Sequence, residues 1–484
     1  MCGTEITMRI LRPTLSIVLA LAVCLVTFQF GMVAAQQNDR NIRITNGTNI
    51  VVVNLYISNS ASKAWAEDAL GNDVVQPGNS ISFNVNDGSG ACIFDFAFVL
   101  ENGQRIERPA VNVCTTTTLT VLRPDAEDKR TVDVCLKGSI CTPVQILFGT
   151  DRQRLDKPKR IGFGGQRAGA LQLGAAVVTV PRAKRNRGQV NRPSWLDRKL
   201  GISAEGDPAR HFTIPDGGIL LFSSTADFVK AMKGTVARAG EFKDHAIVFV
   251  HGYNVSFDDA LYRASQITYD LGTNDVPFGS MFVYSWPSAG DPSAYGYDED
   301  SARYSVTNLL EFIRIVAHQS NAKRVHVIAH SMGSFALLEA LQSLTSTPSK
   351  SPVIDQLILA APDIDAIEFD KIAVKISGLA KGITMYASSK DVAMLAARRF
   401  RYGAARAGDI TVSGPTVATS VDTIDVSTLS TEIFTLGHAE YADRKELLND
   451  MGLLFRNGDR PPHKRNINYK QQGEGARIYW RYAD

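Results

Sequence analysis

A serine between small residues, Ser331 in Ala329-His-Ser-Met-Gly333, is the position of this sequence that most directly indicates chemistry. The largely apolar run Val325–Ala329 precedes it, and apolar residues at helical spacing follow it from Phe335 to Leu341. A serine at a strand-to-helix turn of this kind projects from the edge of a sheet, and the tightness of the turn requires small flanking residues. The pattern is typical of a nucleophile elbow, with Ala329 where glycine is usual, and it predicts acyl-transfer chemistry at Ser331.

A nucleophilic serine needs a histidine that takes its proton and a carboxylate that orients the histidine. In hydrolases with this elbow both residues follow the serine, each after a later strand. We assign the base to His438, because it is the one histidine between the elbow and the last thirty residues of the chain. It follows the candidate strand 423–426.

The acid is expected at the end of the second strand after the elbow, where the predicted strand 382–387 runs into Asp391. We therefore assign the acid to Asp391. Asp363 and Asp365 follow the earlier predicted strand 356–361 and remain rivals for this role. We expect Asp363 instead to cap the segment after it by accepting backbone N–H bonds.

The tetrahedral oxyanion needs backbone N–H donors, and the first comes from the residue after the nucleophile, Met332. The short apolar run Ala246–Val250 is typical of a strand buried in a parallel sheet, and it ends in His251-Gly252 before a new helix. Such enzymes place the second donor at this kind of strand end. We assign the second donor to Tyr253.

Six stretches carry a family resemblance when they are taken in order: Phe148-Gly-Thr-Asp-Arg152, Val250-His-Gly-Tyr-Asn254, Tyr284-Ser-Trp-Pro-Ser-Ala-Gly290, Ala329-His-Ser-Met-Gly333, Ala360-Ala-Pro-Asp363 and Tyr386-Ala-Ser-Ser-Lys-Asp391. Together they resemble the bacterial alpha/beta hydrolases of the esterase/lipase superfamily that form a family of unknown function. The resemblance covers about residues 144–455. It implies a Ser-Asp-His hydrolase without a cofactor and says little about the substrate. The chain departs from the pattern after the closing histidine, where Ala439 stands in place of the expected serine or asparagine.

Length and composition indicate a globular protein of two domains, with 484 residues, 44% hydrophobic and 21% charged. The formal net charge of +3 is close to balance and argues against a nucleic-acid-binding protein. The sequence has no P-loop Gly-Lys-Ser/Thr and no His-Glu-x-x-His zinc motif. We therefore expect no metal and no other cofactor, and a small-molecule ester or lipid as the substrate.

Residues 1–35 are expected to be a signal peptide. Arg9 and Arg12 precede an uncharged run from Leu15 to Phe30, and Val33-Ala34-Ala35 offers small residues to a signal peptidase. The protein is therefore expected to be exported, either to the periplasm or out of the cell. A retained membrane anchor is the alternative, since the uncharged run is just below the roughly 17 residues that span a bilayer.

Four cysteines follow the leader, all before residue 142. An even number of cysteines in one exported segment favours disulfides. Their spacing favours Cys92 with Cys114 and Cys135 with Cys141. Residues 144–455 contain no cysteine, which excludes a thiol nucleophile there.

Residues 36–122 are expected to form a small all-β, sandwich-like domain. Alternating runs of β-branched and aromatic residues are separated there by Gly, Asn and Pro clusters. Trp65 is expected to pack in the core of this domain rather than to bind a ligand. The segment 123–143 is predicted to be a linker. The alternating runs that predict strands in the N-terminal domain are 43–48, 51–57, 80–85, 92–99 and 117–121.

From residue 144 to 455, strands alternate with amphipathic helices such as 257–271 and 306–317. This alternation predicts an α/β fold with a doubly wound, mostly parallel sheet, and the resemblance makes it a sheet of the alpha/beta-hydrolase type. Residues 456–484, rich in Arg, Lys, Pro and Gln, are expected to be a mobile tail.

Two functions are compatible with these patterns. The first is an exported serine hydrolase that cleaves carboxylic esters or related acyl bonds. The alternative is a non-enzymatic cell-envelope binding protein, which keeps the hydrolase fold as a scaffold and contacts the envelope through its N-terminal domain. The enzyme is favoured, because a scaffold has no need for a serine, a histidine and an acid at separate strand ends.

Overall fold

The computed structural model describes two compact units, Met1–Arg123 and Pro124–Asp484, called here the N-terminal and C-terminal units. The predicted signal peptide, 1–35, lies outside the described residues. The described residues are 40–483 except for 47–50, 63, 77–78, 102, 104, 122–134, 136–139, 157–159, 183–186, 193–206, 240–241, 274–275, 345–352, 390–402 and 430–440.

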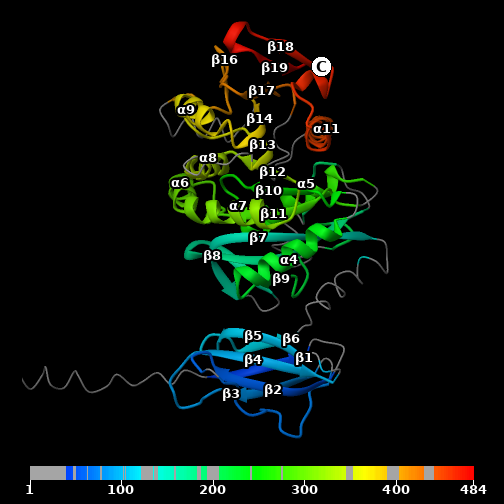
Figure 1. The fold of residues 1–484 in the computed structure, drawn as a ribbon, viewed down its shortest axis with the longest axis vertical. Coiled ribbons are helices and arrows are strands. Elements are labelled where there is room, and N and C mark those ends of the chain that lie inside the picture. Colours follow the sequence, from blue (N-terminus) through cyan, green and yellow to red (C-terminus); the bar gives the residue numbers. More distant parts are fainter. Residues whose placement is uncertain are drawn as a thin grey trace, which may run out of the picture. The chain divides into compact units, whose positions relative to one another are not determined.

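The N-terminal unit is all-β, as predicted (Figure 1). It contains two three-stranded sheets, of order β3-β1-β6 and β2-β4-β5. Their inward-facing side chains form one buried cluster that includes Ile42, Leu55, Phe96 and Phe98. The strands are β1 (Asn41–Asn46), β2 (Val52–Asn59), β3 (Ser80–Asn84), β4 (Ile93–Leu100), β5 (Arg105–Asn112) and β6 (Thr118–Val121).

Strand β5 was not among the predicted strands. Its sequence contains Pro109 and three charged residues, which is unusual for a strand in the middle of a sheet. The strand lies at a sheet edge, and its pairing with β4 is irregular next to Ala110, whose φ is +56°. An edge position tolerates proline because the missing N–H would face solvent.

Trp65 is 39% exposed, so the prediction that it packs in the core is wrong. The guanidinium of Arg105 lies 4.9 Å from the centre of the Trp65 ring and 5.4 Å from that of Tyr56. A cation over the ring face stabilises the indole where it is exposed.

Both predicted disulfides are present. Cys92 is bonded to Cys114 in the N-terminal unit, and Cys135 is bonded to Cys141 at the start of β7. The first bond closes the segment that leads from β4 through β5 to the turn before β6. The second lies within the segment 123–143, which was predicted to be a linker.

An eleven-stranded sheet runs through the C-terminal unit in the order β18-β19-β17-β14-β13-β12-β10-β11-β7-β8-β9 (Figure 1). The strands from β19 to β7 are parallel, whereas β18 at one edge and β8 and β9 at the other pair antiparallel. The predicted α/β class with a mostly parallel sheet is therefore confirmed. The strands are β7 (Cys141–Asp156), β8 (Ile161–Pro181), β9 (Ile219–Leu221), β10 (His245–Val250), β11 (Ser280–Ser285), β12 (Arg324–His330), β13 (Ile354–Ala360), β14 (Ala380–Ala387), β17 (Val421–Asp425), β18 (Tyr469–Gln472) and β19 (Tyr479–Tyr482).

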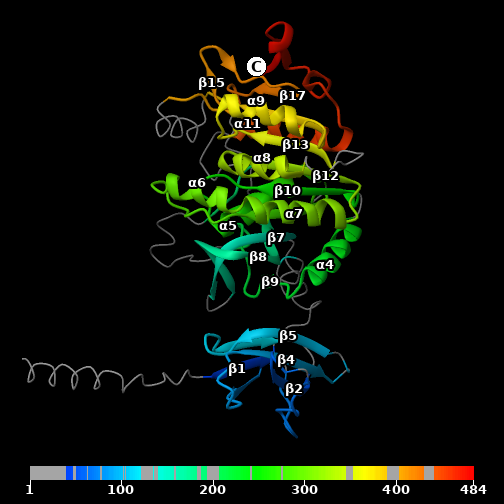
Figure 2. The ribbon, with the colours of Figure 1, turned by 60° about the vertical axis from the view of Figure 1, so that its left-hand side comes forward.

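Helices cover both faces of this sheet. One buried cluster contains residues of α4, α7, α8 and α9, and a second contains residues of α5 and α11. Turning the molecule brings the first layer forward, with α9, α8 and α7 one above another (Figure 2). No helix among the described residues is long and apolar enough to cross a membrane. The helices are α4 (Thr225–Arg238), α5 (Phe257–Leu271), α6 (Tyr295–Tyr304), α7 (Val306–Gln319), α8 (Met332–Leu344), α9 (Ala366–Ile376) and α11 (Tyr441–Asn457).

Helix α5 begins and ends where the sequence predicts. The hydroxyl of Ser256 accepts a hydrogen bond from the N–H of Asp259 and caps the first turn. Asp258 and Asp259 lie in that turn, where the helix dipole favours negative charge. The helix ends at Gly272.

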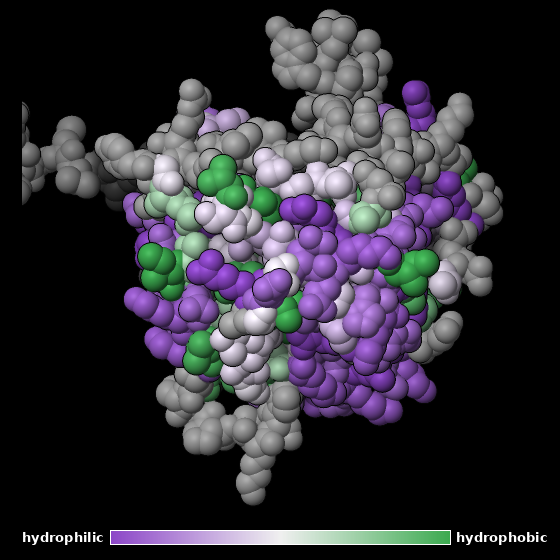
Figure 3. Space-filling view, turned by 90° about the horizontal axis from the view of Figure 1, so that it is seen from above, coloured by the Kyte–Doolittle hydropathy of each residue, from purple (hydrophilic) through white to green (hydrophobic). Residues whose placement is uncertain are grey.

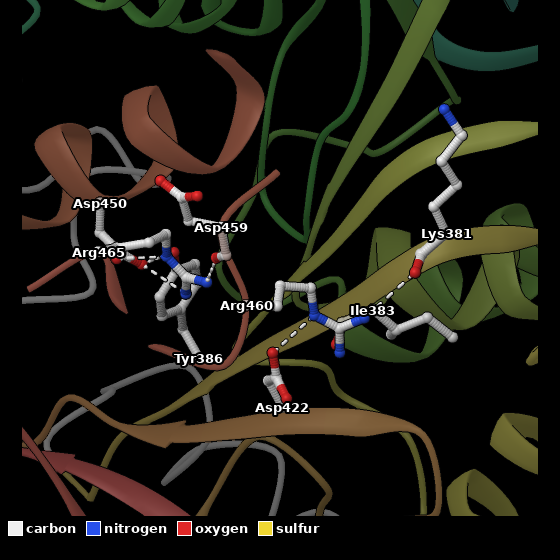
Figure 4. A network of polar contacts seen from close by, with 8 residues as sticks. All are labelled: Lys381, Ile383, Tyr386, Asp422, Asp450, Asp459, Arg460 and Arg465. Atoms are coloured by element: carbon white, nitrogen blue, oxygen red, sulfur yellow. Dashed lines mark hydrogen bonds and ion pairs between the residues drawn. The ribbon is translucent and has the colours of Figure 1, made fainter. Parts of the chain in front are cut away.

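The C-terminal segment is part of the fold, and the prediction of a mobile tail over 456–484 is wrong. Strand β19 pairs parallel with β17, and β18 pairs antiparallel with β19. Figure 4 shows how two arginines hold the segment that leads to these strands.

The side chain of Arg465 is completely buried and forms a two-pronged ion pair with Asp450 on α11, at 2.7 and 3.2 Å. The same carboxylate accepts the Tyr386 hydroxyl of β14 at 2.5 Å. Arg460 donates to Asp422 at 2.7 Å and to the carbonyl of Ile383 at 3.2 Å. These contacts join the C-terminal segment to α11, β14 and β17 (Figure 4).

The surface at the β18–β19 end of the sheet is mostly hydrophilic. Figure 3 shows hydrophobic residues scattered over this face rather than gathered into one patch.

Candidate active site

Ser331 lies in a strained turn between β12 and α8. Its φ is +48°, a left-handed conformation that costs energy for any residue other than glycine. Three hydrogen bonds hold the turn: Ser331 N–H donates to the carbonyl of Ala360 at 2.9 Å, and Ser331 C=O accepts the N–H of Ser334 at 2.9 Å and that of Asp363 at 3.2 Å. The main chain on both sides of the serine is therefore fixed by β13 and by the first turn of α8.

Two glycines allow the loop after β10 to pack against this turn. A Cβ atom on Gly333 would lie 2.1 Å from the carbonyl oxygen of His251, and one on Gly252 would lie 2.6 Å from His330 Nδ1 and 3.0 Å from the Cβ of Ser331. No side chain fits at either position. The requirement for small residues therefore comes from the contact between the two loops as well as from the turn itself.

The hydroxyl of Ser331 is buried, with the residue 1% exposed, and it has no hydrogen-bond partner among the described residues. A buried hydroxyl without a partner destabilises a fold, by about 1–3 kcal/mol for a typical polar group. Such a group is expected where chemistry rather than stability determines the residue. Asp391 and His438, the predicted acid and base, lie outside the described residues.

The loop after β10 uses some of its amides within the described fold and leaves that of Tyr253 without a described partner. Asn254, at φ +56°, donates its N–H to Asp298 at 3.0 Å, and Val255 donates its N–H to the hydroxyl of Ser288 at 3.0 Å. The N–H groups of Tyr253 and Met332 donate to no described residue. The two amides assigned to the oxyanion from the sequence are therefore available as donors among the described residues.

A buried polar network lies beneath this loop, and sequence reasoning did not identify its two charged members, Arg152 and Asp298. Arg152 donates to the carbonyls of Val255 at 2.6 Å and Ser288 at 2.8 Å. Asp298 accepts the Ser288 hydroxyl at 2.5 Å and the Ala289 N–H at 2.7 Å, besides the N–H of Asn254. Three of the resemblance stretches, 148–152, 250–254 and 284–290, meet in this network.

His251 completes the network from within the loop. Its ring stacks on Trp286, with centroids 4.8 Å apart, and the Trp286 N–H donates to the His251 carbonyl at 2.8 Å. His251 Nδ1 lies 2.8 Å from the carbonyl of Gly252, which can only accept, so Nδ1 carries the proton. Nε2 then accepts from Arg152 at 3.3 Å. The ring is a fixed, neutral support of the loop.

The pKa shifts in the network follow from burial. Burial lowers the pKa of Arg152 to about 10, while the Asp298 carboxylate opposes the shift, so Arg152 stays charged at neutral pH. Burial and then the charge of Arg152 hold the pKa of His251 well below its usual value. Burial raises the pKa of Asp298, against its hydrogen bonds.

The two rival acids have other partners. Asp365, and not Asp363 as expected, caps the next helix: it accepts the N–H groups of Ile367 and Glu368 at the start of α9. The Asp363 carboxylate accepts the Tyr295 hydroxyl at 2.7 Å and forms a buried ion pair with Arg406, also at 2.7 Å. Each carboxylate oxygen of Asp363 thus has a described partner, and neither partner is a histidine.

A pocket of about 240 Å³ lies beside the elbow. Two of its lining residues connect it to the elbow. Met332 follows Ser331 in the chain, and Asp363 donates its N–H to the carbonyl of Ser331. The other lining residues are Tyr295, Glu299, Arg303, Phe335, Ile364, Asp365, Glu368, Ala404 and Arg406. Within the described part of the chain, no group of three or more His, Cys, Asp or Glu side chains is arranged to hold a metal ion.

Residues 230–455 match the family described as "Alpha/beta hydrolase of unknown function (DUF900)", in agreement with the resemblance seen in the sequence. The chain is also 26% identical to "Uncharacterized protein alr1448" of Nostoc sp. (strain PCC 7120), over 31% of this chain and 44% of that protein. The match thus spans less than half the length of that relative.

Two solved structures are similar at low identity. One is a "Lipase-esterase related protein" from Clostridium acetobutylicum ATCC 824, with 11% identity over 43% of this chain and 93% of the other, and a TM-score of 0.23. The second is "AbyA5 Wildtype", with 12% identity over 72% of this chain and 78% of the other, and a TM-score of 0.27. TM-scores this low carry no functional argument.

Proposed function

Because residues 230–455 form an alpha/beta hydrolase domain of a family whose function is unknown, we propose that the protein is an exported serine hydrolase that cleaves carboxylic esters or related acyl bonds. The observation that carries the proposal is the setting of Ser331. Its hydroxyl is buried without a described partner in a left-handed turn. The amides of Met332, which follows it in the chain, and of Tyr253, which follows the glycine that packs against the turn, also have no described partner. A catalytic role for the hydroxyl accounts for this combination.

In the proposed mechanism, Ser331 Oγ attacks the carbonyl carbon of the ester while His438 takes the hydroxyl proton. The negative charge that develops on the carbonyl oxygen is stabilised by the N–H groups of Met332 and Tyr253. His438 then returns the proton to the leaving alcohol, and a water molecule hydrolyses the acyl-enzyme by the same two steps. Asp391 orients His438 and stabilises its charged form.

The partners of the two rival carboxylates, Asp363 and Asp365, support the assignment of the acid to Asp391. Asp363 is neutralised by Arg406, and one oxygen of Asp365 is occupied by two N–H groups of α9. Asp363 thus belongs to an ion pair and Asp365 to a helix cap, which favours Asp391 as the acid.

Export is part of the proposal. The leader pattern in 1–35 supports it, and two disulfides are compatible with an oxidising compartment. In the alternative, a non-enzymatic envelope-binding protein, the strained turn at Ser331 would have no use, because a scaffold can relax it with a glycine.

The test is turnover of p-nitrophenyl acetate by the purified chain, with labelling by a fluorophosphonate. Ser331→Ala is expected to lower kcat by roughly three to six orders of magnitude. The control is Ser377→Ala, which removes an exposed hydroxyl at the end of α9. If Ser331→Ala keeps more than about a tenth of wild-type activity, or if folded wild-type protein forms no adduct at Ser331, the proposal fails.

A further inference from the structure

The pocket beside the elbow is built mainly from charged side chains. Six of its eleven lining residues carry a carboxylate or a guanidinium group: Glu299, Arg303, Asp363, Asp365, Glu368 and Arg406. Apolar contact is limited to a few side chains, chiefly Met332, Phe335 and Ile364. An alkyl chain in this pocket would remove water from charged groups without replacing their hydrogen bonds, which is unfavourable.

Arg406 lines the pocket and has donors without a partner among the described residues. Its side chain is 9% exposed, and its Nε donates to Asp363 at 2.7 Å. Its two terminal NH₂ groups donate to no described residue. The position is fixed by the main chain, because Ala407 N–H donates to the carbonyl of Ile364 and Ala366 N–H donates to that of Ala405. The fork of Arg406 is thus held ready for an acceptor.

Acceptors are available on the helix at the pocket wall. Asp365 uses one carboxylate oxygen to cap α9, and its second oxygen accepts from no described residue. The exposed carboxylate of Glu368 has no described partner. The pocket is therefore lined both by donors, on Arg406, and by acceptors, on Asp365 and Glu368, together with the aromatic ring of Phe335.

The sign of the charge limits what these groups can bind. Four carboxylates and two guanidinium groups line the pocket, so a carboxylate or phosphate would meet an excess of negative charge. A hydroxyl group is both donor and acceptor and carries no charge. Several hydroxyls on one small ring would satisfy Arg406 and the carboxylates together.

We infer that the pocket holds a carbohydrate, so that the substrate is a short-chain ester of a sugar rather than a lipid. This inference rests on the proposed function. The reaction is ester hydrolysis: the acyl carbon–oxygen bond breaks, the acyl group passes to Ser331 and then to water, and the sugar leaves with its hydroxyl restored. The pocket volume of about 240 Å³ suits a ligand as small as one sugar ring, because it is below the roughly 300–1,000 Å³ of sites for drug-sized ligands.

The experiment compares three esters: a mono-acetylated methyl glucoside, ethyl acetate and ethyl octanoate. The first two share the acyl group and differ in the hydroxyls of the alcohol. We expect kcat/KM for the glucoside to exceed that for ethyl acetate by about tenfold or more, which corresponds to about one charged hydrogen bond. Ethyl octanoate should be the poorest of the three.

A pair of variants on α9 separates pocket contacts from general effects. Glu368→Ala is expected to lower the ratio of kcat/KM values, glucoside over ethyl acetate, by at least about fivefold. Asp370→Ala removes an exposed carboxylate on the same helix that does not line the pocket, and it should keep the wild-type ratio.

The outcomes distinguish the two proposals. If Ser331 is labelled and p-nitrophenyl acetate is hydrolysed, but ethyl octanoate is preferred or the glucoside gains nothing over ethyl acetate, the inference about the pocket is overturned and the hydrolase stands. An unchanged ratio in Glu368→Ala also overturns it. If Ser331 is not labelled and no ester is hydrolysed, both proposals fall.

Discussion

Replacing Asp298 by asparagine tests whether the buried network beneath the loop after β10 positions the Tyr253 amide for catalysis. Asp298 accepts three hydrogen bonds, from Asn254 N–H at 3.0 Å, the Ser288 hydroxyl at 2.5 Å and Ala289 N–H at 2.7 Å. Asparagine keeps the shape of the side chain but has a single acceptor oxygen. Because the two amides approach different oxygens, either Asn254 or Ala289 must lose its acceptor.

The size of the effect follows from these contacts. A hydrogen bond to a charged group contributes about 1.5–3 kcal/mol, so the free energy of unfolding should fall by about that amount. Loss of one oxyanion donor lowers kcat by about 10²–10³. Asn254 directly follows Tyr253, so a shift of Asn254 displaces the Tyr253 N–H without removing it. We therefore expect kcat to fall by about 10- to 100-fold, with little change in KM, because the contact forms in the transition state.

The assay is steady-state hydrolysis of p-nitrophenyl acetate, together with a thermal melt and the inhibition constant of a trifluoromethyl ketone, which forms an oxyanion at the same place. Asp300→Asn is the matched control, since Asp300 is exposed on the same helix, α6. If Asp298→Asn melts at a lower temperature while kcat stays within about threefold of wild type, the network stabilises the fold but does not position the oxyanion donor.

Three further changes have defined outcomes. Asp391→Asn should lower kcat by about 10⁴, whereas Asp363→Asn should mainly lower the melting temperature, because it breaks a buried ion pair. The measurements are kcat and the melting curve of each variant. The reverse pattern would assign the acid to Asp363, one strand earlier. Arg465→Met leaves the carboxylate of Asp450 buried without its cation, so urea unfolding should show a loss of about 3–5 kcal/mol, and a loss below about 1 kcal/mol would contradict the role of this pair. Burial lowers the pKa of His326, so it stays neutral in the fold while the unfolded chain binds a proton, and the melting temperature should fall as the pH drops below about 6.5. In His326→Phe the melting temperature should depend less on pH across this range; an unchanged dependence would show that this histidine does not contribute.

The features that could be predicted from the sequence are those coded within a few consecutive residues. The elbow at Ser331, the ends of α5 and the buried strand β10 each depend on local spacing, on a cap or on an uninterrupted apolar run. The choice of Tyr253 and Met332 as donors follows from the same local logic and stays a prediction; both amides are without a described partner. The predicted acid and base stay predictions.

The features that sequence reasoning missed depend on partners far apart in the chain. Arg152 and Asp298 meet beneath one loop, although nearly 150 residues separate them, and each charge taken alone indicates a solvated surface. Arg465 was assigned to a mobile tail for the same reason, because nothing near it shows that Asp450 will neutralise it in the core. Trp65 shows the opposite error: a large apolar residue predicted to be buried is stabilised at the surface by Arg105.

The pairing of β19 with β17 determines where the protein can be divided. A recombinant fragment that ended at residue 455, where the family match ends, would lack β18 and β19 and would present β17 as an open strand edge. It would also lack Arg465, so the carboxylate of Asp450 would be left in the core without its cation. Open edges recruit other chains, and destabilised units unfold more often, so such a fragment should aggregate during expression. The unit that folds and can be studied by itself must therefore extend through Tyr482.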